Sequence, residues 1–317
     1  MSTRAPLEPR DLASILLVVL TWGVNFVVMK VGLASLTPFQ LGAGRYLFAF
    51  LPLALFIRPP RVPVRWLLAF GLAQGVGQFG LLFVALHVGM SAALASVLVQ
   101  TQVFFSALFG VTLLHERIGG PLKVGMVFAA AGLACFAWES ASTGGTVTAW
   151  GLALTLASAV MWAASNIVVR KARQAAGDFD PLAFVVWCGG VPILPFIALS
   201  WWFDPAAVHA NWLHAPWSGW LAIALLGWIA TDLGYGLWTR LLQRFPASRV
   251  APFSLGVPLI GLGAGILFLG EQVRPLQWAG AALVLCALAC VVAGARFGRG
   301  ASSAGSAPGN VARESGD

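Results

Sequence analysis

The stretch NFVVMK at residues 25–30 recurs 141 positions later as NIVVRK at residues 166–171. A second correspondence has an offset of 155 positions and joins Glu116 to Glu271, each of which closes an apolar segment. Two further pairs lie at the same offset of 155 positions: Gly125 with Gly280, and Cys135 with Cys290. Two halves that share one plan indicate an internal duplication.

The composition indicates a membrane protein. Hydrophobic residues make up 59% of the chain and charged residues only 9%, whereas a soluble domain carries about 25% charged residues. Arg4 and Arg10 precede the first apolar run, as in a signal peptide, but the run is too long and lacks a cleavage site of small residues. We therefore expect a retained membrane helix, with the lipid bilayer as the main solvent of the protein.

Ten segments are apolar and long enough for a spanning helix, which needs roughly 20 residues. They are residues 12–33, 37–57, 66–87, 91–114, 121–138, 148–169, 181–203, 217–239, 249–270 and 275–295. Each is expected to be helical, because a backbone in lipid must satisfy its own hydrogen bonds. The sequence thus predicts an all-α integral membrane protein with ten transmembrane helices. Residues 1–11 form a cytoplasmic N-terminus, and the Gly-, Ser- and Ala-rich residues 296–317 a disordered cytoplasmic tail.

The basic residues predict the orientation. With the N-terminus inside, 16 of the 19 Lys and Arg residues lie in inside segments, whereas only Lys30 and Arg274 lie outside and Arg45 lies within a span. Such an excess indicates that both termini are cytoplasmic. The inside residues are Arg4, Arg10, Arg58, Arg61, Arg65, Arg117, Lys123, Arg170, Lys171, Arg173, Arg240, Arg244, Arg249, Arg296, Arg299 and Arg313. The net charge of +8 is therefore spread over membrane-flanking loops, which argues against a nucleic-acid partner.

Each half has five spans, an odd number, so the second half is expected to cross the membrane in the opposite direction. Lys30 then lies at the outer end of its span and its counterpart Lys171 at the inner end. Glu116 lies at an inner end and Glu271 at an outer one. Two inverted five-helix repeats around a central cavity have two near-equivalent arrangements, which is the geometric basis of alternating access in transporters.

Asp232 is the outstanding polar position. It lies eight residues before Arg240, which places its Cα ~12 Å along the helix from the inner end. A carboxylate at that depth is costly and usually marks a substrate pathway or a proton relay. The alternatives are that it reaches the surface, stays protonated, or pairs structurally with Arg45.

Arg45 is the only lysine or arginine deep inside a predicted span rather than within three residues of its end, and it lies about two turns from Thr37 and Pro38. A guanidinium group binds a substrate carboxylate through two parallel hydrogen bonds. Alternatively, Arg45 is a fixed partner within the helix bundle.

Four amide and indole side chains are further candidates. Asn25 and Asn166 open the two copies of the repeated stretch, and buried amides either line a cavity or join helices. Trp162 lies four residues before Asn166 and shares its helix face. Gln78 shares a helix face with Gln74 in the third span.

Gln100 and Gln102 are two positions apart and point to different faces of an α-helix. Only one of them is expected to face a cavity; the spacing does not choose between them, and Gln100 enters the candidate set. Tyr235 and Trp238 follow Asp232 on its helix. They form either an aromatic wall of the cavity or, for Trp238, part of the interfacial belt.

Pro252 and Pro258 interrupt the ninth span. In transporters such prolines often lie at a binding site or hinge, although packing kinks are equally common. Glu116 and Glu271 each stand between two helices, where a carboxylate can cap the helix that follows.

The sequence shows no enzyme chemistry. It contains no nucleophile–base pair, no phosphate-binding loop and no metal-ligand spacing among its cysteines and histidines. We therefore expect no catalytic residue, no metal and no cofactor.

Several stretches resemble the EamA branch of the drug/metabolite transporter superfamily, over about residues 11–295. They are TWGVNFVVMKVGL at 21–33, GRY at 44–46, the segment 89–110, GYGLW at 234–238, RVAP at 249–252 and the segment 258–271.

The resemblance implies two EamA repeats, at residues 12–138 and 148–295, in a bacterial cytoplasmic (inner) membrane. It implies the following motif positions: Trp22, Asn25, Arg45, Asn166, Tyr235 and Trp238. The carboxylate of Asp232 departs from the family pattern, in which this position is apolar. Either the protein has its own proton or cation site, or its substrate differs.

The expected function is secondary active export of small amino-acid-type metabolites, with O-acetylserine and cysteine as the precedent that the resemblance implies. Proton antiport by alternating access is the expected mechanism, with protons bound at Asp232. A multidrug or cationic-compound exporter is the alternative within the superfamily. A non-transporting accessory protein is the alternative of another class. The oligomeric state stays open.

Overall fold

The computed structural model describes residues 8–114, 119–142, 148–245 and 247–304. Within these ranges every element of secondary structure is a helix, so the predicted all-α fold is confirmed. Large apolar side chains cover the outside; Leu55, Trp150 and Leu267 are each at least 75% exposed. An apolar exterior of this extent faces lipid in a membrane protein.

The first half contains nine helical elements. They are α1 (Pro9–Leu33), α2 (Pro38–Ala54), α3 (Val64–Phe70), η1 (Gly71–Gly80), α4 (Leu81–His87), α5 (Ala92–Leu98), η2 (Val99–Thr101), α6 (Gln102–Leu114) and α7 (Gly120–Ser142). The second half runs from α8 to α16. Its elements are α8 (Ala149–Ala176), α9 (Pro181–Gly189), α10 (Ile193–Phe203), η3 (Ala206–Val208), α11 (Asn211–His214), α12 (Trp217–Ala224), η4 (Leu225–Leu233), α13 (Gly234–Arg244), α14 (Ala247–Val250), η5 (Ala251–Leu255), α15 (Gly256–Leu269) and α16 (Pro275–Ala304).

Nine helical rods in the described ranges are long and apolar enough to cross a membrane. Rods are numbered below after the ten predicted spans, with α2 as the second. The helix α2 is shorter, with 17 residues, and begins at a capping box in which Thr37 accepts from the backbone N–H of Gln40. The predicted count of ten spans therefore stays a prediction at this helix.

Four rods contain irregular turns that the sequence did not reveal. The third and eighth rods contain π-helical segments, η1 and η4, and the fourth and ninth contain 3₁₀ segments, η2 and η5. The irregular turns thus occupy corresponding rods of the two halves. Such turns rotate side chains away from the regular α-helical positions and are frequent at functional sites.

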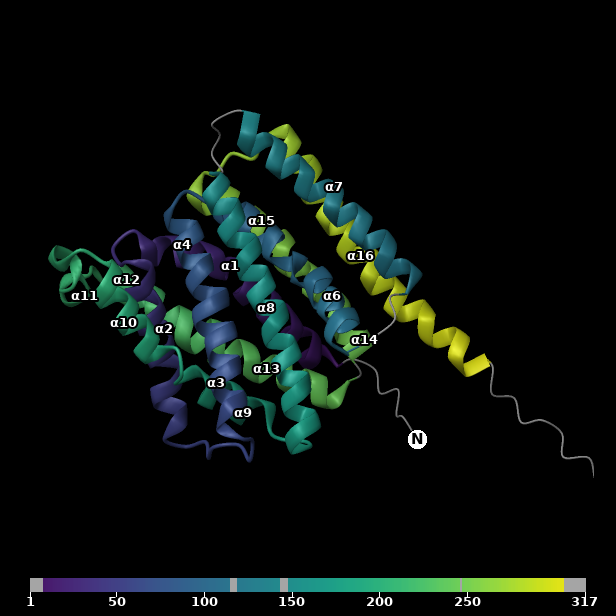
Figure 1. The fold of residues 1–317 in the computed structure, drawn as a ribbon, viewed down its shortest axis with the longest axis horizontal. Coiled ribbons are helices and arrows are strands. Elements are labelled where there is room, and N and C mark those ends of the chain that lie inside the picture. The colour runs from purple at the N-terminus through teal and green to yellow at the C-terminus, as the bar shows by residue number, and fades with distance from the viewer. Residues whose placement is uncertain (1–7, 115–118, 143–147, 246, 305–317) are drawn as a thin grey trace, which may run out of the picture.

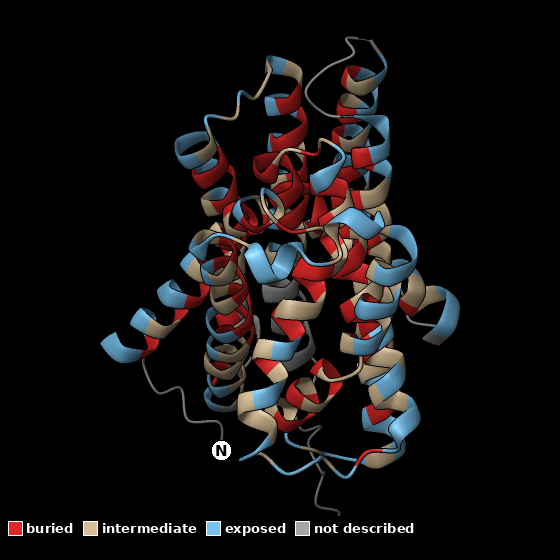
Figure 2. Ribbon diagram, turned by 90° about the vertical axis from the view of Figure 1, so that its left-hand side faces the viewer, coloured by how far each residue is buried: buried red, intermediate tan, exposed pale blue. Residues whose placement is uncertain are grey.

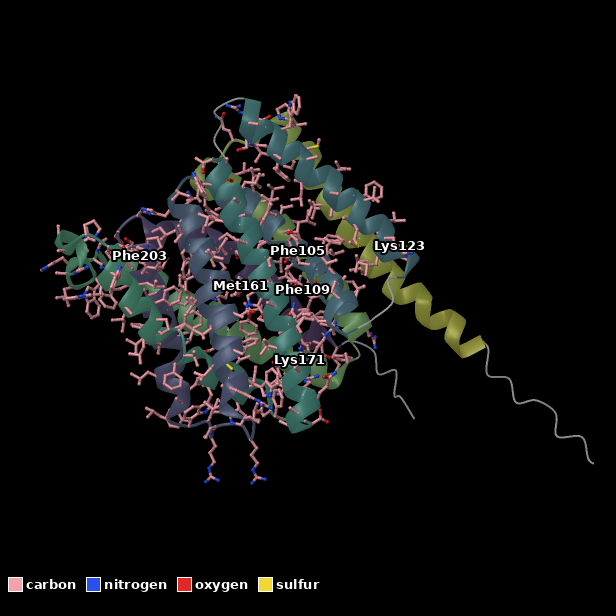
Figure 3. All side chains as sticks on the ribbon, viewed as in Figure 1. Phe105, Phe109, Lys123, Met161, Lys171 and Phe203 are labelled. Atoms are coloured by element: carbon pink, nitrogen blue, oxygen red, sulfur yellow. The ribbon has the colours of Figure 1, made fainter. Side chains whose placement is uncertain are left out.

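Helix packing also follows the duplication. The first rod, α1, packs along α15 of the ninth, and its counterpart α8 packs along α6 of the fourth. The last helices of the two halves, α7 and α16, lie side by side (Figure 1). Their backbones approach closely, because a Cβ on Gly132 would lie 2.8 Å from the carbonyl oxygen of Gly280. Between α8 and η1, Gly77 leaves room for the side chain of Met161 (Figure 3).

Buried residues gather inside the bundle, and exposed residues lie on its outward faces (Figure 2). All seven residues of α5 are buried. The carboxylate of Glu271 caps this helix, accepting from Ser91 Oγ at 2.8 Å and from the backbone N–H groups of Ala92 and Ala93 at 2.7 Å each. Gly270 turns the chain toward α5 by adopting a left-handed conformation with φ +64°.

The expectation that Glu271 caps the helix that follows it is therefore wrong. The chain turns back at Gly270, so the carboxylate meets a helix of the other half. Its repeat counterpart Glu116 lies outside the described residues. The predicted disordered tail is also wrong in part, because α16 continues without a proline through residues 296–304. Residues 305–317 lie outside the described ranges.

Candidate functional site

A cavity of about 380 Å³ lies between helices of both halves. It is lined by all nine side chains that the sequence analysis assigned to the substrate or cavity set: Trp22, Asn25, Arg45, Gln78, Gln100, Trp162, Asn166, Tyr235 and Trp238. These residues come from six of the ten predicted spans. Their convergence is the geometry expected of a binding site between two repeats.

One wall of the cavity is aromatic. The ring of Trp22 on α1 lies 5.3 Å from that of Tyr235 and 5.6 Å from that of Trp238, both on α13. The indole N–H of Trp22 donates to the backbone carbonyl of Ala230 at 2.9 Å. This bond ties α1 to the π-helical segment η4, where a carbonyl is available for it.

Arg45 is 2% exposed and lines the cavity from α2. Its Nη2 donates to Thr231 Oγ1 at 3.1 Å, and its guanidinium carbon lies 3.7 Å from the ring centroid of Phe79. The remaining nitrogens, Nε and Nη1, are buried and have no hydrogen-bond partner among the described residues. A buried cation with unsatisfied donors is costly, which sets Arg45 apart from the other polar side chains of the cavity.

Asp232 lies beside the cavity rather than in its wall. It lines a smaller chamber of about 30 Å³, which shares Arg45, Phe79 and Tyr235 with the main cavity. In the described part of the chain, no ion pair joins Asp232 to Arg45. Of the alternatives considered for this carboxylate, a structural pair with Arg45 is thus not the arrangement seen.

A polar network joins α8 to α6 and η1, and Gln78, Gln102 and Asn166 of this network line the cavity. The amide of Asn166 on α8 donates to Gln102 Oε1 at 3.0 Å and to Ser106 Oγ at 3.1 Å. Gln74 accepts a hydrogen bond from Ser165 and donates one to Gln78. The amides of η1 are therefore joined to each other and to α8.

Gln100 and Gln102 both line the cavity, so the expectation that only one of them faces it is wrong. The reason is the 3₁₀ segment η2, Val99–Thr101. A 3₁₀ turn has three residues rather than 3.6, so side chains two positions apart lie closer on the helix surface than in an α-helix.

Asn25 differs from its repeat counterpart. It is 8% exposed and lines the cavity, yet its Oδ1 has no hydrogen-bond partner within the described ranges. Asn166 makes two hydrogen bonds through its amide nitrogen. The two asparagines thus occupy equivalent places in the sequence but not equivalent environments.

The two candidate hinge prolines lie where the ninth rod changes its helical form. Pro252 is the second residue of η5, and Pro258 is buried in the first turn of α15. The carbonyl of Pro258 accepts from Ser96 Oγ of α5 at 3.3 Å. A hinge motion at these residues stays a prediction.

Sequence reasoning missed Phe79 and Thr231, which hold Arg45 in place. Neither could be found by motif, because phenylalanine and threonine are ordinary in membrane helices. A search for groups able to stabilise the single buried arginine would have pointed to an aromatic face and a hydroxyl.

Comparison with known proteins gives matches along most of the chain. Residues 11–138 and 149–293 each match the EamA-like transporter family. A protein of Salmonella typhimurium named "Probable amino-acid metabolite efflux pump" is 38% identical over 291 residues, covering 92% of this chain and 97% of that protein. A protein of Escherichia coli with the same name is 37% identical over 283 residues, covering 89% and 94%. A solved crystal structure matches with a TM-score of 0.59 at 18% identity over 91% of this chain and 98% of its own, which supports the fold alone.

Proposed function

Because the chain belongs to the EamA-like transporter family, we propose that it exports small amino-acid-type metabolites such as O-acetylserine and cysteine from the cytoplasm. The proposed mechanism is secondary active transport by proton antiport, with alternating access to the central cavity. The names of the relatives from Salmonella typhimurium and Escherichia coli support this substrate class.

The observation that carries the proposal is the state of Arg45. Two of its guanidinium nitrogens, Nε and Nη1, are buried in the cavity region without a partner among the described residues. A substrate carboxylate would accept from one of them together with the second N–H of Nη2, and would neutralise the charge. The cavity volume of about 380 Å³ suits a small metabolite, since small-molecule sites measure roughly 300–1,000 Å³.

Proton coupling is assigned to Asp232. Its chamber adjoins the main cavity and shares Arg45 with it, so the charge on the carboxylate affects a ligand bound at the arginine. In the proposed cycle Asp232 binds a proton when the cavity faces outward, as the substrate leaves. It releases the proton when the cavity faces the cytoplasm.

Alternating access is supported by the repeated packing of the two halves. The pair α1–α15 corresponds, under the internal repeat, to the pair α8–α6, because α8 is the counterpart of α1 and α6 is the counterpart of α15. A second conformation in which these pairs swap roles would open the cavity to the other side. The distribution of basic residues supports an inner-membrane location with both termini in the cytoplasm.

Transport in proteoliposomes tests the proposal. Labelled cysteine and O-acetylserine are followed with and without a pH gradient, for the wild type and for Asp232→Asn. We expect gradient-dependent movement in the wild type and its loss in the variant. If the wild type moves neither compound, the substrate class is wrong. A panel of cationic drugs then tests the alternative exporter, which the aromatic wall of Trp22, Tyr235 and Trp238 would favour.

A further inference from the structure

Resting on the proposed function, we infer that Asn25 accepts a hydrogen bond from the α-ammonium group of the substrate. Asn25 would bind the α-ammonium group and Arg45 the α-carboxylate, so that together they select an unmodified α-amino acid. Asn25 is then a specificity-determining residue, whereas its counterpart Asn166 is part of the protein scaffold.

The two asparagines differ because their neighbours differ. Asn166 donates to Gln102 and Ser106 on α6. At the offset of 155 positions, the corresponding residues of the second half are Val257 and Gly261. Neither has a side chain that can hydrogen-bond, so the contact made by α8 and α6 has no polar equivalent between α1 and α15.

An unsatisfied buried amide has a cost. Burying a polar group without a partner destabilises a protein, and most such groups in native structures are satisfied. Asn25 lines the cavity, and no described hydrogen bond holds its amide in one orientation. The carbonyl oxygen is therefore free to turn toward a donor that enters the cavity, and an ammonium group supplies three such donors.

Asn25 and Arg45 approach the cavity around the same segment, η4. Trp22 lies one helical turn before Asn25 and donates to the carbonyl of Ala230. The next residue, Thr231, accepts from Arg45 Nη2. The helix turn that carries Asn25 and the side chain of Arg45 are thus held at consecutive residues of one segment.

This pairing matches the chemistry of an α-amino acid. Its carboxylate accepts from Arg45 Nη1 or Nε together with the second N–H of Nη2, and its ammonium donates to Asn25 Oδ1. A deaminated acid leaves the Asn25 acceptor unpaired. An N-acetyl derivative removes the positive charge and adds bulk at the same point. Sites with buried polar groups reject analogues that leave those groups unpaired.

Ligand-induced thermal stabilisation of the purified full-length protein tests the inference, because a ligand stabilises the state that binds it. The probes are cysteine, N-acetylcysteine and 3-mercaptopropionate, the deaminated acid. For the wild type we expect cysteine to bind at least about tenfold more tightly than either analogue. In Asn25→Ala the difference should fall to about twofold or less, with cysteine losing affinity and the deaminated acid keeping it.

Asn211→Ala is the control, because it removes an asparagine on α11 that lines neither cavity. It should retain the tenfold preference for cysteine. The inference is overturned if wild-type protein binds the deaminated acid as tightly as cysteine, or if Asn25→Ala keeps the wild-type preference. The transport assay decides the proposed function separately: selective binding without flux would contradict export but support the head-group site.

Discussion

The two repeats share their plan but differ at positions that line the central cavity and the smaller chamber beside it. Asn166 is bonded to Gln102 and Ser106, whereas Asn25 has a free amide oxygen. Counted from the first residue of each π-helical segment, the eighth residue is Gln78 in η1 and Asp232 in η4. One repeat thus carries a neutral amide where the other carries a carboxylate. We therefore propose that positions whose surroundings differ between the repeats carry substrate recognition and coupling.

The largest expected effect comes from Arg45, which has no basic counterpart inside a span of the second half. Arg45→Met should lower the initial rate of cysteine transport at least about a hundredfold, because the carboxylate loses its charged donors. The free energy of unfolding should stay unchanged or rise by about 1–4 kcal/mol, because an unpaired buried charge is removed. Flux and thermal unfolding are measured on the same preparation. Retained flux with reduced stability would show a structural role instead.

Removing the carboxylate from η4 makes the two π-helical segments more alike. Asp232→Asn should still allow downhill movement of substrate. The variant should not accumulate substrate when a pH gradient is imposed. In the wild type, exchange of one proton per substrate supports a ratio of substrate concentrations across the membrane of about tenfold per pH unit. Accumulation at several imposed gradients is the measurement. A variant with undiminished accumulation would place proton coupling elsewhere.

The contact between the halves at α5 should affect stability. Glu271→Ala removes three hydrogen bonds to a carboxylate and should cost about 2 kcal/mol of unfolding free energy. Glu271→Gln keeps one acceptor oxygen and should cost less. Both are compared with the wild type by thermal unfolding in detergent. Equal unfolding temperatures for all three proteins would show that this cap is dispensable.

A smaller effect is expected at the tryptophans near the two asparagines. Trp22→Phe loses the bond to the carbonyl of Ala230 and should cost about 1 kcal/mol of unfolding free energy. Trp162→Phe is the matched control, since no hydrogen bond of its indole is seen among the described residues. It should change the unfolding free energy by less than about 0.5 kcal/mol. An equal cost at both positions would remove the distinction between the two sites.

Much of the architecture could be predicted because apolar length and charge position are read directly from sequence. The convergence of Trp22, Asn166 and Tyr235 on one cavity followed from midplane polarity, the repeat and the family resemblance. The irregular turns could not be predicted, since they depend on packing between helices. That limitation explains the wrong expectation for Gln100 and Gln102, and the location of Asp232 in a side chamber.

Long-range contacts were also beyond the sequence pattern. The position of Glu271 next to a helix end indicated a cap, but only the fold shows that the capped helix, α5, belongs to the other half. Likewise, the Asn25 amide oxygen lacks a partner because Val257 and Gly261, which are distant in sequence, have no side chain that can hydrogen-bond to it.

The most direct test of the comparison is to measure cysteine flux and unfolding temperature together for Asn25→Ala and Asn166→Ala. We predict that Asn25→Ala lowers flux at least about tenfold at a near wild-type unfolding temperature. Asn166→Ala should lower the unfolding temperature, because it removes the hydrogen bonds from α8 to Gln102 and Ser106, and should lose less flux per folded protein than Asn25→Ala. Equal losses of flux in the two variants would contradict the assignment of recognition to one repeat.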